Sequence, residues 1–234
     1  MPKPIENFDH KNYTDKFLKS LYDDGFFMRN KRDKEIPNIN IATILKESLD
    51  FNSVFDLGCG IGTYLDTFLK KGCNKVLGFE YGIEFSKNYM SKDILPFVSF
   101  GDVTKKIKIN EKYDCGMSIE VAEHIPQEFS DALVDNLVDN TINVIIFTAA
   151  PPGQGGTGHI NCQPKEFWIE KFEKKGWILS IKETEAIKNK MIPIRSFPPR
   201  DINEKISFYQ ENQKSLCWKW VHDNLMIYRR KCND

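Results

Sequence analysis

A chain of 234 residues is long enough for one sizeable α/β domain and too short for two comfortable ones. Its 33 basic and 33 acidic side chains cancel. A nucleic-acid-binding protein normally carries a basic surplus or a basic face, because phosphate contacts dominate its affinity. We therefore consider nucleic acid an unlikely partner on this charge balance and expect a small-molecule ligand.

The cysteines are scattered and form no Cys-x-x-Cys pair, which argues against both a disulfide framework and a zinc site. They predict free thiols in a reducing compartment, so we expect a cytoplasmic protein and no metal centre. The first residues contain no apolar signal region, and no run approaches the roughly 18 apolar residues of a membrane helix. No membrane partner is expected.

The chain begins with a polar segment, residues 1–50, that is predicted to be helical around residues 15–22 and again after Pro37. From residue 51 onward, strands alternate with helices, and a polar insertion is expected at about 184–216. Strands are predicted at residues 53–57, 75–80, 97–100, 113–119, 143–149, 177–181 and 225–229, and helices at 63–71, 83–90, 127–140 and 164–175.

This alternation predicts an α/β fold, a mostly parallel doubly wound sheet with helices on both faces. Ligands of such sheets bind beyond the carboxyl ends of the strands. The loops that follow the strands should therefore share one rim, and the functional residues should lie there.

The first of these loops has the pattern Asp56-x-Gly58-x-Gly60-x-Gly62, directly after a strand and at the start of a helix. Glycines there let the backbone approach a nucleotide closely, because no Cβ is in the way. A dinucleotide site would place its third glycine at position 63, which is Thr63. The alternative is a purely structural strand-to-helix turn.

Acidic residues follow the next three strands. Glu80 ends the second strand, where a carboxylate can accept both ribose hydroxyls of a nucleoside. Asp102 follows the third strand and can accept from an adenine amino group, although it can also serve as a turn former. Glu120 follows the fourth strand. Glu80 could instead be a solvated charge at a strand end.

Four segments, FDLGCGIGTYL, VLGFEYG, FGDVT and SIEVAEHIP, resemble in order and spacing the successive motifs of class I (Rossmann-like) methyltransferases that use S-adenosylmethionine (SAM). The resemblance spans roughly residues 50–182. It implies a seven-stranded sheet whose final strand is antiparallel and inserted beside the sixth. It also implies SAM as cofactor, S-adenosylhomocysteine as product, and residues 51–234 as the SAM-binding domain, covered by the helical segment 1–50.

Carried over residue by residue, the resemblance implies that three glycines flank the methionine part of SAM, that Glu80 binds the ribose and that Asp102 binds the adenine. Acidic residues after the fourth strand would face the sulfonium. The implied cofactor site comprises Asp56, Gly58, Gly60, Gly62, Glu80, Tyr81, Asp102, Val103 and Glu120.

The Glu-His-Ile-Pro sequence at 123–126 resembles the branches of the family that methylate metabolites, so the expected reaction is methyl transfer to an oxygen or nitrogen of a small molecule. A histidine can remove the proton of a hydroxyl acceptor near neutral pH. His124 and His159 fall on loops at the predicted rim and are our catalytic candidates; for either one a structural hydrogen bond is the alternative.

Two further segments are candidates for contacting the methyl acceptor. The polar, glycine-rich loop at 151–163 fits a lid over the acceptor or an ordered surface loop. Arg195 and Arg200, around a proline-rich turn, could clamp a carboxylate or phosphate, or lie in a solvated connection. Rival functions are an RNA or protein methyltransferase, a nicotinamide-dependent oxidoreductase and a SAM-binding module without catalysis. No oligomeric state is indicated.

Overall fold

The computed structural model describes residues 3, 5, 8–194 and 216–231. Nine strands are found in this part of the chain, and most begin and end within two residues of the predicted bounds. They are β1 (Ser53–Leu57), β2 (Lys75–Glu80), β3 (Val98–Phe100), β4 (Tyr113–Ile119), β5 (Thr141–Thr148), β6 (Trp177–Leu179), β7 (Ile192–Ile194), β8 (Leu216–Trp218) and β9 (Met226–Arg230).

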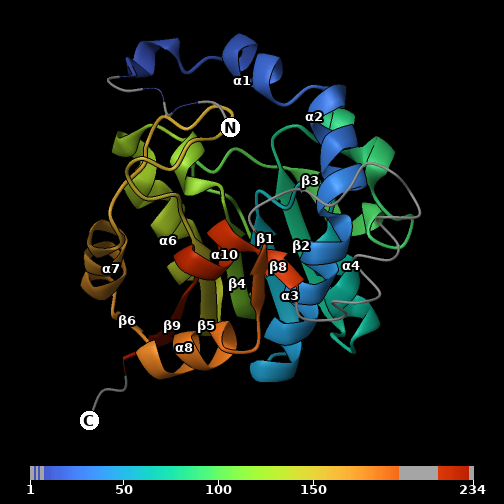
Figure 1. The fold of residues 1–234 in the computed structure, drawn as a ribbon, viewed down its shortest axis with the longest axis vertical. Coiled ribbons are helices and arrows are strands. Elements are labelled where there is room, and N and C mark those ends of the chain that lie inside the picture. The colour runs from blue at the N-terminus through green and yellow to red at the C-terminus, as the bar shows by residue number, and fades with distance from the viewer. Residues whose placement is uncertain (1–2, 4, 6–7, 195–215, 232–234) are drawn as a thin grey trace.

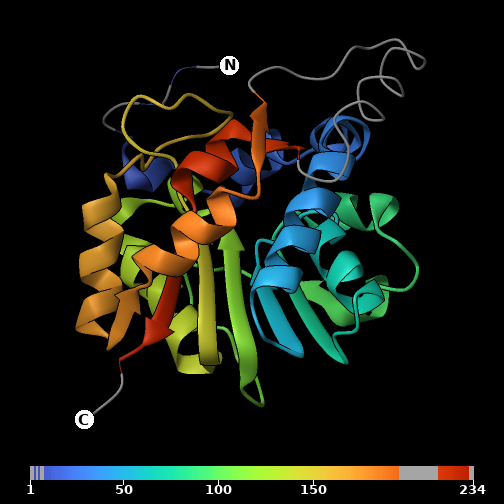
Figure 2. The same ribbon diagram turned by 60° about the horizontal axis from the view of Figure 1, so that its bottom comes forward.

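Seven strands form one sheet in the order β3-β2-β1-β4-β5-β9-β6 (Figure 1). The pairs among β1 to β5 are parallel, whereas β9 runs antiparallel to both β5 and β6. Figure 2 shows the red arrow of β9 pointing opposite to the green arrow of β4. The predicted seven-stranded sheet, with its last strand inserted beside the sixth, is confirmed.

The main helices connect these strands or precede them. They are α1 (Asp15–Leu21), α2 (Asp24–Arg29), α3 (Glu35–Ser48), α4 (Thr63–Lys70), α5 (Ile83–Ser86), α6 (Ser130–Asn140), α7 (Lys165–Lys174), α8 (Ile181–Lys188) and α10 (Lys219–Asn224). Short 3-10 turns lie at η1 (His10–Asn12), η3 (Lys87–Tyr89), η4 (Leu95–Phe97), η5 (Ala122–His124) and η6 (Gln127–Phe129).

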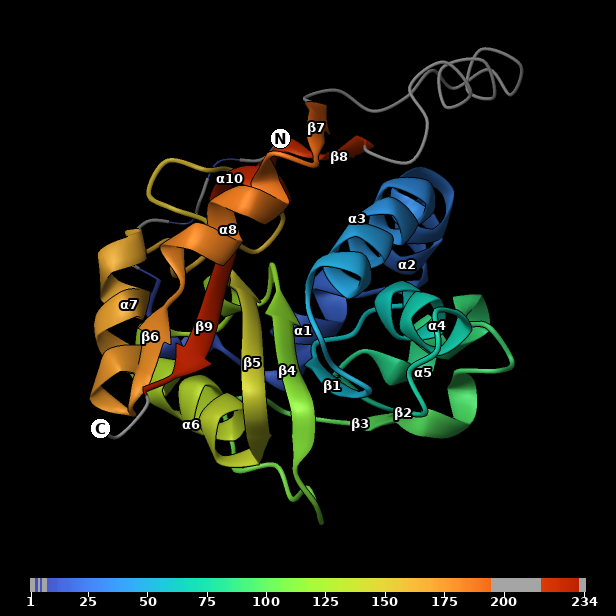
Figure 3. The same ribbon diagram turned by 90° about the horizontal axis from the view of Figure 1, so that it is seen from below.

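Alternating side chains of the central strands pack into two separate cores, one on each face of the sheet. Val54 and Ile146 join the core under α3, α4 and α8, whereas Phe55 and Ile145 join the core under α6 and α7. Figure 3 looks at the sheet from below, from β6 on the left toward β1 and β2 on the right. Because both faces are covered, the central strands are apolar throughout, which is typical of parallel sheets.

The region after β6 differs from the sequence prediction. The strand ends at Leu179, and α8 forms where the chain was expected to leave the strand and begin a polar insertion. Buried Thr184 in α8 accepts a hydrogen bond from the backbone N–H of Ile227, and Glu183 pairs with Arg229. These contacts with β9 hold a charged segment as a helix. Arg195 and Arg200 lie outside the described residues.

The N-terminal helices lie across the end of the sheet at which the parallel strands finish; in Figure 2 they are the blue helices at the top. Side chains cap their starts: Thr14 accepts from the Phe17 N–H, and Asp23 from the Phe26 N–H. Between α2 and α3 the helix continues as a π-helical turn, η2 (Asn30–Lys34). No helix among the described residues is long and apolar enough to cross a bilayer.

Gly116, in the middle of β4, gives a test of the packing between β4 and its neighbours. A Cβ built there would lie 2.9 Å from the ring of Phe55 and still closer to Thr141 Oγ1, which donates to the Leu137 carbonyl. Gly116→Ala should lower the free energy of unfolding by about 1–3 kcal/mol through overpacking, measured by urea denaturation.

The matched control is Gly25→Ala on α2, where the new methyl group meets only the ends of flexible side chains. That substitution should be neutral or stabilising by about 0.5–1 kcal/mol, since alanine favours a helix over glycine. Equal effects of the two substitutions would contradict the close packing around Gly116.

Candidate functional site

A cavity of about 510 Å³ lies at the carboxyl ends of the parallel strands. This volume is in the range of roughly 300–1,000 Å³ that is typical of small-molecule sites. Its walls come from the N-terminal helices, the loops after β1 to β5, and the segment of β8 and α10. The predicted site residues line it with one exception, Gly62.

The glycines after β1 have different surroundings. A Cβ on Gly60 would point into open space, and Gly60 lines the cavity. Gly62 does not line it, because its α-carbon faces Ile94, and a Cβ there would lie 2.8 Å from that side chain. We expected Gly62 beside the cofactor, but in the structure it serves the packing of the turn into α4.

Glu80 connects the glycine loop to the end of β2. Its Oε2 accepts from the Gly60 N–H and its Oε1 from the Gly82 N–H, both at 2.8 Å. Burial raises the pKa of Glu80 to about 7, although these backbone hydrogen bonds act in the opposite direction. Asp56 is also buried in the same wall, and desolvation followed by the charge of Glu80 raises its pKa well above the ordinary value.

Asp102, after β3, lines the cavity and is fixed by its neighbours. Its Oδ1 accepts from the N–H and the hydroxyl of Thr104, and its Oδ2 pairs with Lys105 at 2.9 Å. Burial pushes the pKa of Asp102 up, but these hydrogen bonds outweigh it and hold the pKa below its ordinary value. Val103 beside it is buried and supplies an apolar patch of the wall.

Tyr81 links the cavity to the N-terminal helices. Its hydroxyl donates to Asp15 in α1 at 2.8 Å, and its ring packs against that of Phe100, with 5.3 Å between the ring centres. Desolvation, followed by the hydrogen bond to Asp15, raises the pKa of Tyr81 to about 12. The predicted cofactor residues on three neighbouring strand ends are thus brought together with helices from the start of the chain.

Glu120, directly after β4, is the single non-glycine residue with positive φ in the described part of the chain, at +55°. Its N–H donates to Thr148 Oγ1 at 2.8 Å, and its carboxylate accepts from the amides of Gln154 and Asn224. Strained backbone of this kind persists where surrounding contacts hold it, often at functional sites. Burial raises the pKa of Glu120.

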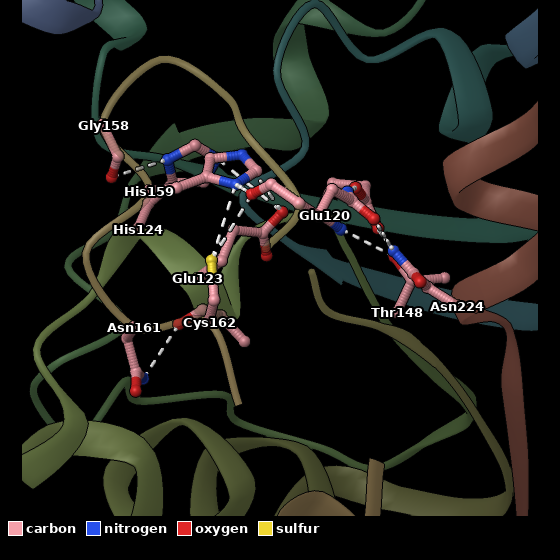
Figure 4. A network of polar contacts seen from close by, with 11 residues as sticks. Glu120, Glu123, His124, Thr148, Gly158, His159, Asn161, Cys162 and Asn224 are labelled. Carbon is pink, nitrogen blue, oxygen red and sulfur yellow. Dashed lines mark hydrogen bonds and ion pairs between the residues drawn. The ribbon is translucent and has the colours of Figure 1, made fainter. Parts of the chain in front are cut away.

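The two candidate histidines meet at the same end of the cavity, although they are far apart in the chain (Figure 4). Their ring centres are 4.9 Å apart in an edge-to-face arrangement. Glu123 lies beneath them and lines the cavity too. Burial lowers the pKa of His124 to about 3 and also lowers the pKa of His159, so both rings are neutral at pH 7.

Several lining residues were not anticipated from the sequence. Lys34, at the end of the π-helical turn, and Asn38, in α3, line the cavity, and no sequence periodicity revealed the turn. Trp218 and Trp220 stack with their ring centres 4.7 Å apart at one wall. The only sign of this aromatic wall in the sequence is the close spacing of Trp218 and Trp220.

Carboxyl groups outnumber cationic side chains in the cavity lining. The basic residues are Arg29 and Lys34, and the acidic residues are Asp33, Asp56, Glu80, Asp102, Glu120 and Glu123. Burial raises the pKa of Asp56, Glu80, Glu120 and Glu123, and a positively charged ligand would favour their ionised forms.

No protein-family model and no curated protein matches the sequence. Solved structures do match the fold. The sugar N-methyltransferase KedS8 from Streptoalloteichus is 10% identical, with 89% of this chain and 92% of that chain covered and a TM-score of 0.57. Human N-acetylserotonin methyltransferase in complex with SAM is 12% identical, with 93% and 60% covered and a TM-score of 0.56.

The methyltransferase domain of bacterial CtHen1-C is 17% identical, with 85% of this chain and 99% of that chain covered and a TM-score of 0.52. At such identities the likeness establishes the fold. The chain has the Rossmann-like α/β methyltransferase fold, as its sequence motifs predicted.

The protonation of Glu80 gives a pH-dependent test of the site's geometry. Because burial raises its pKa from 4.5 to about 7, the folded protein holds this proton more tightly than the unfolded chain. The stability that this provides is complete below pH 4.5 and is lost as the pH rises through about 7. The unfolding free energy of wild type relative to Glu80→Gln should therefore fall over this interval and level off above it.

The measurement is urea denaturation of both proteins at a series of pH values without ligand. Glu84→Gln, at an exposed position on α5, reports the effect of the same chemical change away from the cavity. If the difference in unfolding free energy between wild type and Glu80→Gln stays constant from pH 4.5 to pH 7, the raised pKa of Glu80 is contradicted.

Proposed function

We propose that this protein is a SAM-dependent methyltransferase that transfers the methyl group to an oxygen or nitrogen of a small molecule. The observation that supports this most is that a glycine after β1 and carboxylates after β2 and β3 line the same cavity. Gly60 opens toward the cavity, and carboxylates at the ends of the two next strands, Glu80 and Asp102, line the same space. A nucleoside with an amino-acid tail fits this arrangement.

In this proposal the methionine part of SAM lies against Gly58 and Gly60, and the ribose hydroxyls donate to Glu80. The adenine amino group donates to Asp102, beside Val103 and Tyr81. Glu80 already accepts two backbone hydrogen bonds, and a carboxylate has about four acceptor sites, so capacity for the ribose remains. The sulfonium points toward Glu120, and the acidic lining suits its positive charge.

Residues 1–50 form the cover of this site in our proposal, and residues 51–234 the SAM-binding domain. Tyr13, Tyr22 and Phe27 line the cavity from the covering helices, and Tyr81 is tied to Asp15 of α1. A cover of this kind excludes water from the transfer and favours a small acceptor over a macromolecule. Together with the balanced charge of the chain, it is our reason for preferring a metabolite to RNA or protein.

The chemistry needs little beyond alignment, because the methyl carbon of a sulfonium is already electrophilic. A lone pair of the acceptor attacks that carbon, the C–S bond breaks, and its electron pair stays on sulfur as the thioether of S-adenosylhomocysteine. An acceptor hydroxyl also gives up its proton. His124 and His159 line the cavity as neutral rings, and we propose that they act on the acceptor.

A nicotinamide-dependent oxidoreductase is less well supported, because the glycine spacing ends at Gly62 instead of position 63. All five described cysteines carry free thiols, which fits the cytoplasmic location that we propose.

Gly60→Val tests the cofactor site directly. The added side chain would enter the cavity, so we expect loss of S-adenosylhomocysteine binding in isothermal titration calorimetry. Gly72→Val is the matched control: Gly72 also has positive φ, +93° against +58°, and open space around its α-carbon, but does not line the cavity. Both substitutions should cost at least about 1–2 kcal/mol of stability, yet Gly72→Val should keep the affinity. Unchanged binding by Gly60→Val would exclude this site.

Methyl transfer can be tested with isotopically labelled SAM and a metabolite extract freed of macromolecules. We expect label in small molecules, and a turnover reduced by about a hundredfold or more in His159→Ala, with S-adenosylhomocysteine affinity within about twofold of wild type. His222→Ala, outside the cavity, is the control. Label incorporated only into added RNA or protein would favour a macromolecular acceptor, and no label in any fraction would favour a non-catalytic module.

A further inference from the structure

The carboxylate of Glu123 is buried without a hydrogen bond of normal geometry. Its side chain has no solvent exposure, and neither carboxylate oxygen has such a partner among the described residues, although the Glu120 carboxyl group and the Ala150 backbone lie nearby. Leaving a polar group unpaired in the interior costs about 1–3 kcal/mol, and more when the group is charged. Its carboxylate oxygen instead lies near two imidazole nitrogens, at distances too long for hydrogen bonds.

These nitrogens are the Nε2 atoms of His159 and His124, which lie 3.8 Å and 3.9 Å from Glu123 Oε1. The other ring nitrogen of each histidine faces a backbone carbonyl: Nδ1 of His124 that of Gly158, and Nδ1 of His159 that of Gln154. A carbonyl can only accept, so these contacts assign the proton of each ring to Nδ1, which leaves the Nε2 lone pair to bind a cation. A carboxylate oxygen and two nitrogen lone pairs are thus gathered at one point.

The arrangement is built by backbone contacts, not by chance proximity of long side chains. The carbonyl of Glu123 accepts from the N–H groups of both Ile160 and Asn161, and the Asn161 side chain donates to the Ala122 carbonyl. These bonds tie the loop after β5 to η5. Gly156 packs against Nε2 of His159 so closely that a Cβ would collide with the ring.

From this geometry we propose that Glu123, His124 and His159 bind one divalent transition-metal ion at the end of the cavity. The three ligand atoms lie within 4.8 Å of one another. Ligands about 2.1 Å from an ion, at angles of a four- or six-coordinate site, are roughly 3.0–3.4 Å apart, so each would move inward by only a few tenths of an ångström. The ion would give the buried carboxylate of Glu123 a positively charged partner.

The ligand set also selects the class of metal. Two imidazoles and one carboxylate suit Zn²⁺, Co²⁺, Mn²⁺ or Fe²⁺, whereas Ca²⁺ and Mg²⁺ prefer oxygen ligands. The Nδ1–H bonds to backbone carbonyls are the outer contacts that metal-binding histidines generally make. Lys34 lines the same cavity and opposes a cation there, and Glu120 offsets its charge. The sequence predicted no metal site, because the cysteines lack metal-binding spacing and this cluster contains no cysteine.

Three protein ligands leave coordination positions open to the cavity. If the proposed function is correct, on which this step alone rests, an acceptor hydroxyl bound there would release its proton to water more easily, since a cation stabilises the alkoxide. The oxygen lone pair would then attack the methyl carbon as described above. The two histidines would act through the ion and not as bases. Binding of the ion itself does not depend on methyl transfer.

The test uses the full chain after treatment with a chelator and passage into metal-free buffer. Titration with Co²⁺ alone should give visible d–d absorption that saturates at one ion per chain, and excess Zn²⁺ should abolish it. The ion should also raise the thermal unfolding midpoint, because a ligand that binds the folded state stabilises it. Failure to saturate near one equivalent, together with an unchanged midpoint, would overturn the proposal without affecting S-adenosylhomocysteine binding.

Glu123→Gln and His159→Asn should each weaken Co²⁺ binding by at least about tenfold, and Gly156→Ala should do so without removing a ligand. His222 is partly exposed and paired with Asp223, so His222→Asn should bind Co²⁺ with wild-type affinity. S-adenosylhomocysteine affinity reports whether each variant is folded. Wild-type Co²⁺ affinity in folded Glu123→Gln and His159→Asn would also overturn the proposal.

Discussion

The carboxylate of Glu80 is the contact on which the shape of the site depends. Through Gly60 and Gly82 it holds the loop after β1 and the loop after β2 at a fixed separation. A parallel sheet brings its strand ends to one rim, but it does not by itself fix the loops that leave them. Here one buried side chain joins two of those loops, and Gly60 faces the cavity as a consequence.

Carboxylates gathered around an enclosed space carry a cost in the protein without its ligand. Burial raises the pKa values of Asp56, Glu80, Glu120 and Glu123, which means that their charged forms are destabilised. A protein selected for stability alone would replace them by apolar groups. Four buried carboxyl groups around one cavity, one of them the strained Glu120, are typical of a functional site.

The loop after β5 completes the other end of the cavity and is held there by η5. Its backbone donates to the Glu123 carbonyl, and Gln154 of this loop reaches Glu120 and Asn224. Residues from β4, the loop and α10 therefore form one polar network. Glu120 lies at the centre of this network, because it is hydrogen-bonded to Thr148, Gln154 and Asn224.

The sequence by itself determined the sheet, because its strands are apolar on both faces and its turns carry glycine or acidic residues at regular places. It also identified two side chains that line the cavity, since Glu80 and Asp102 lie next to strands whose ends must share a rim. Tertiary structure alone decided that Gly62 faces Ile94 and that Lys34 lines the cavity. The meeting of Glu123 and His124 with His159 likewise depends on loop hydrogen bonds between residues distant in the chain, and no local pattern encodes such contacts.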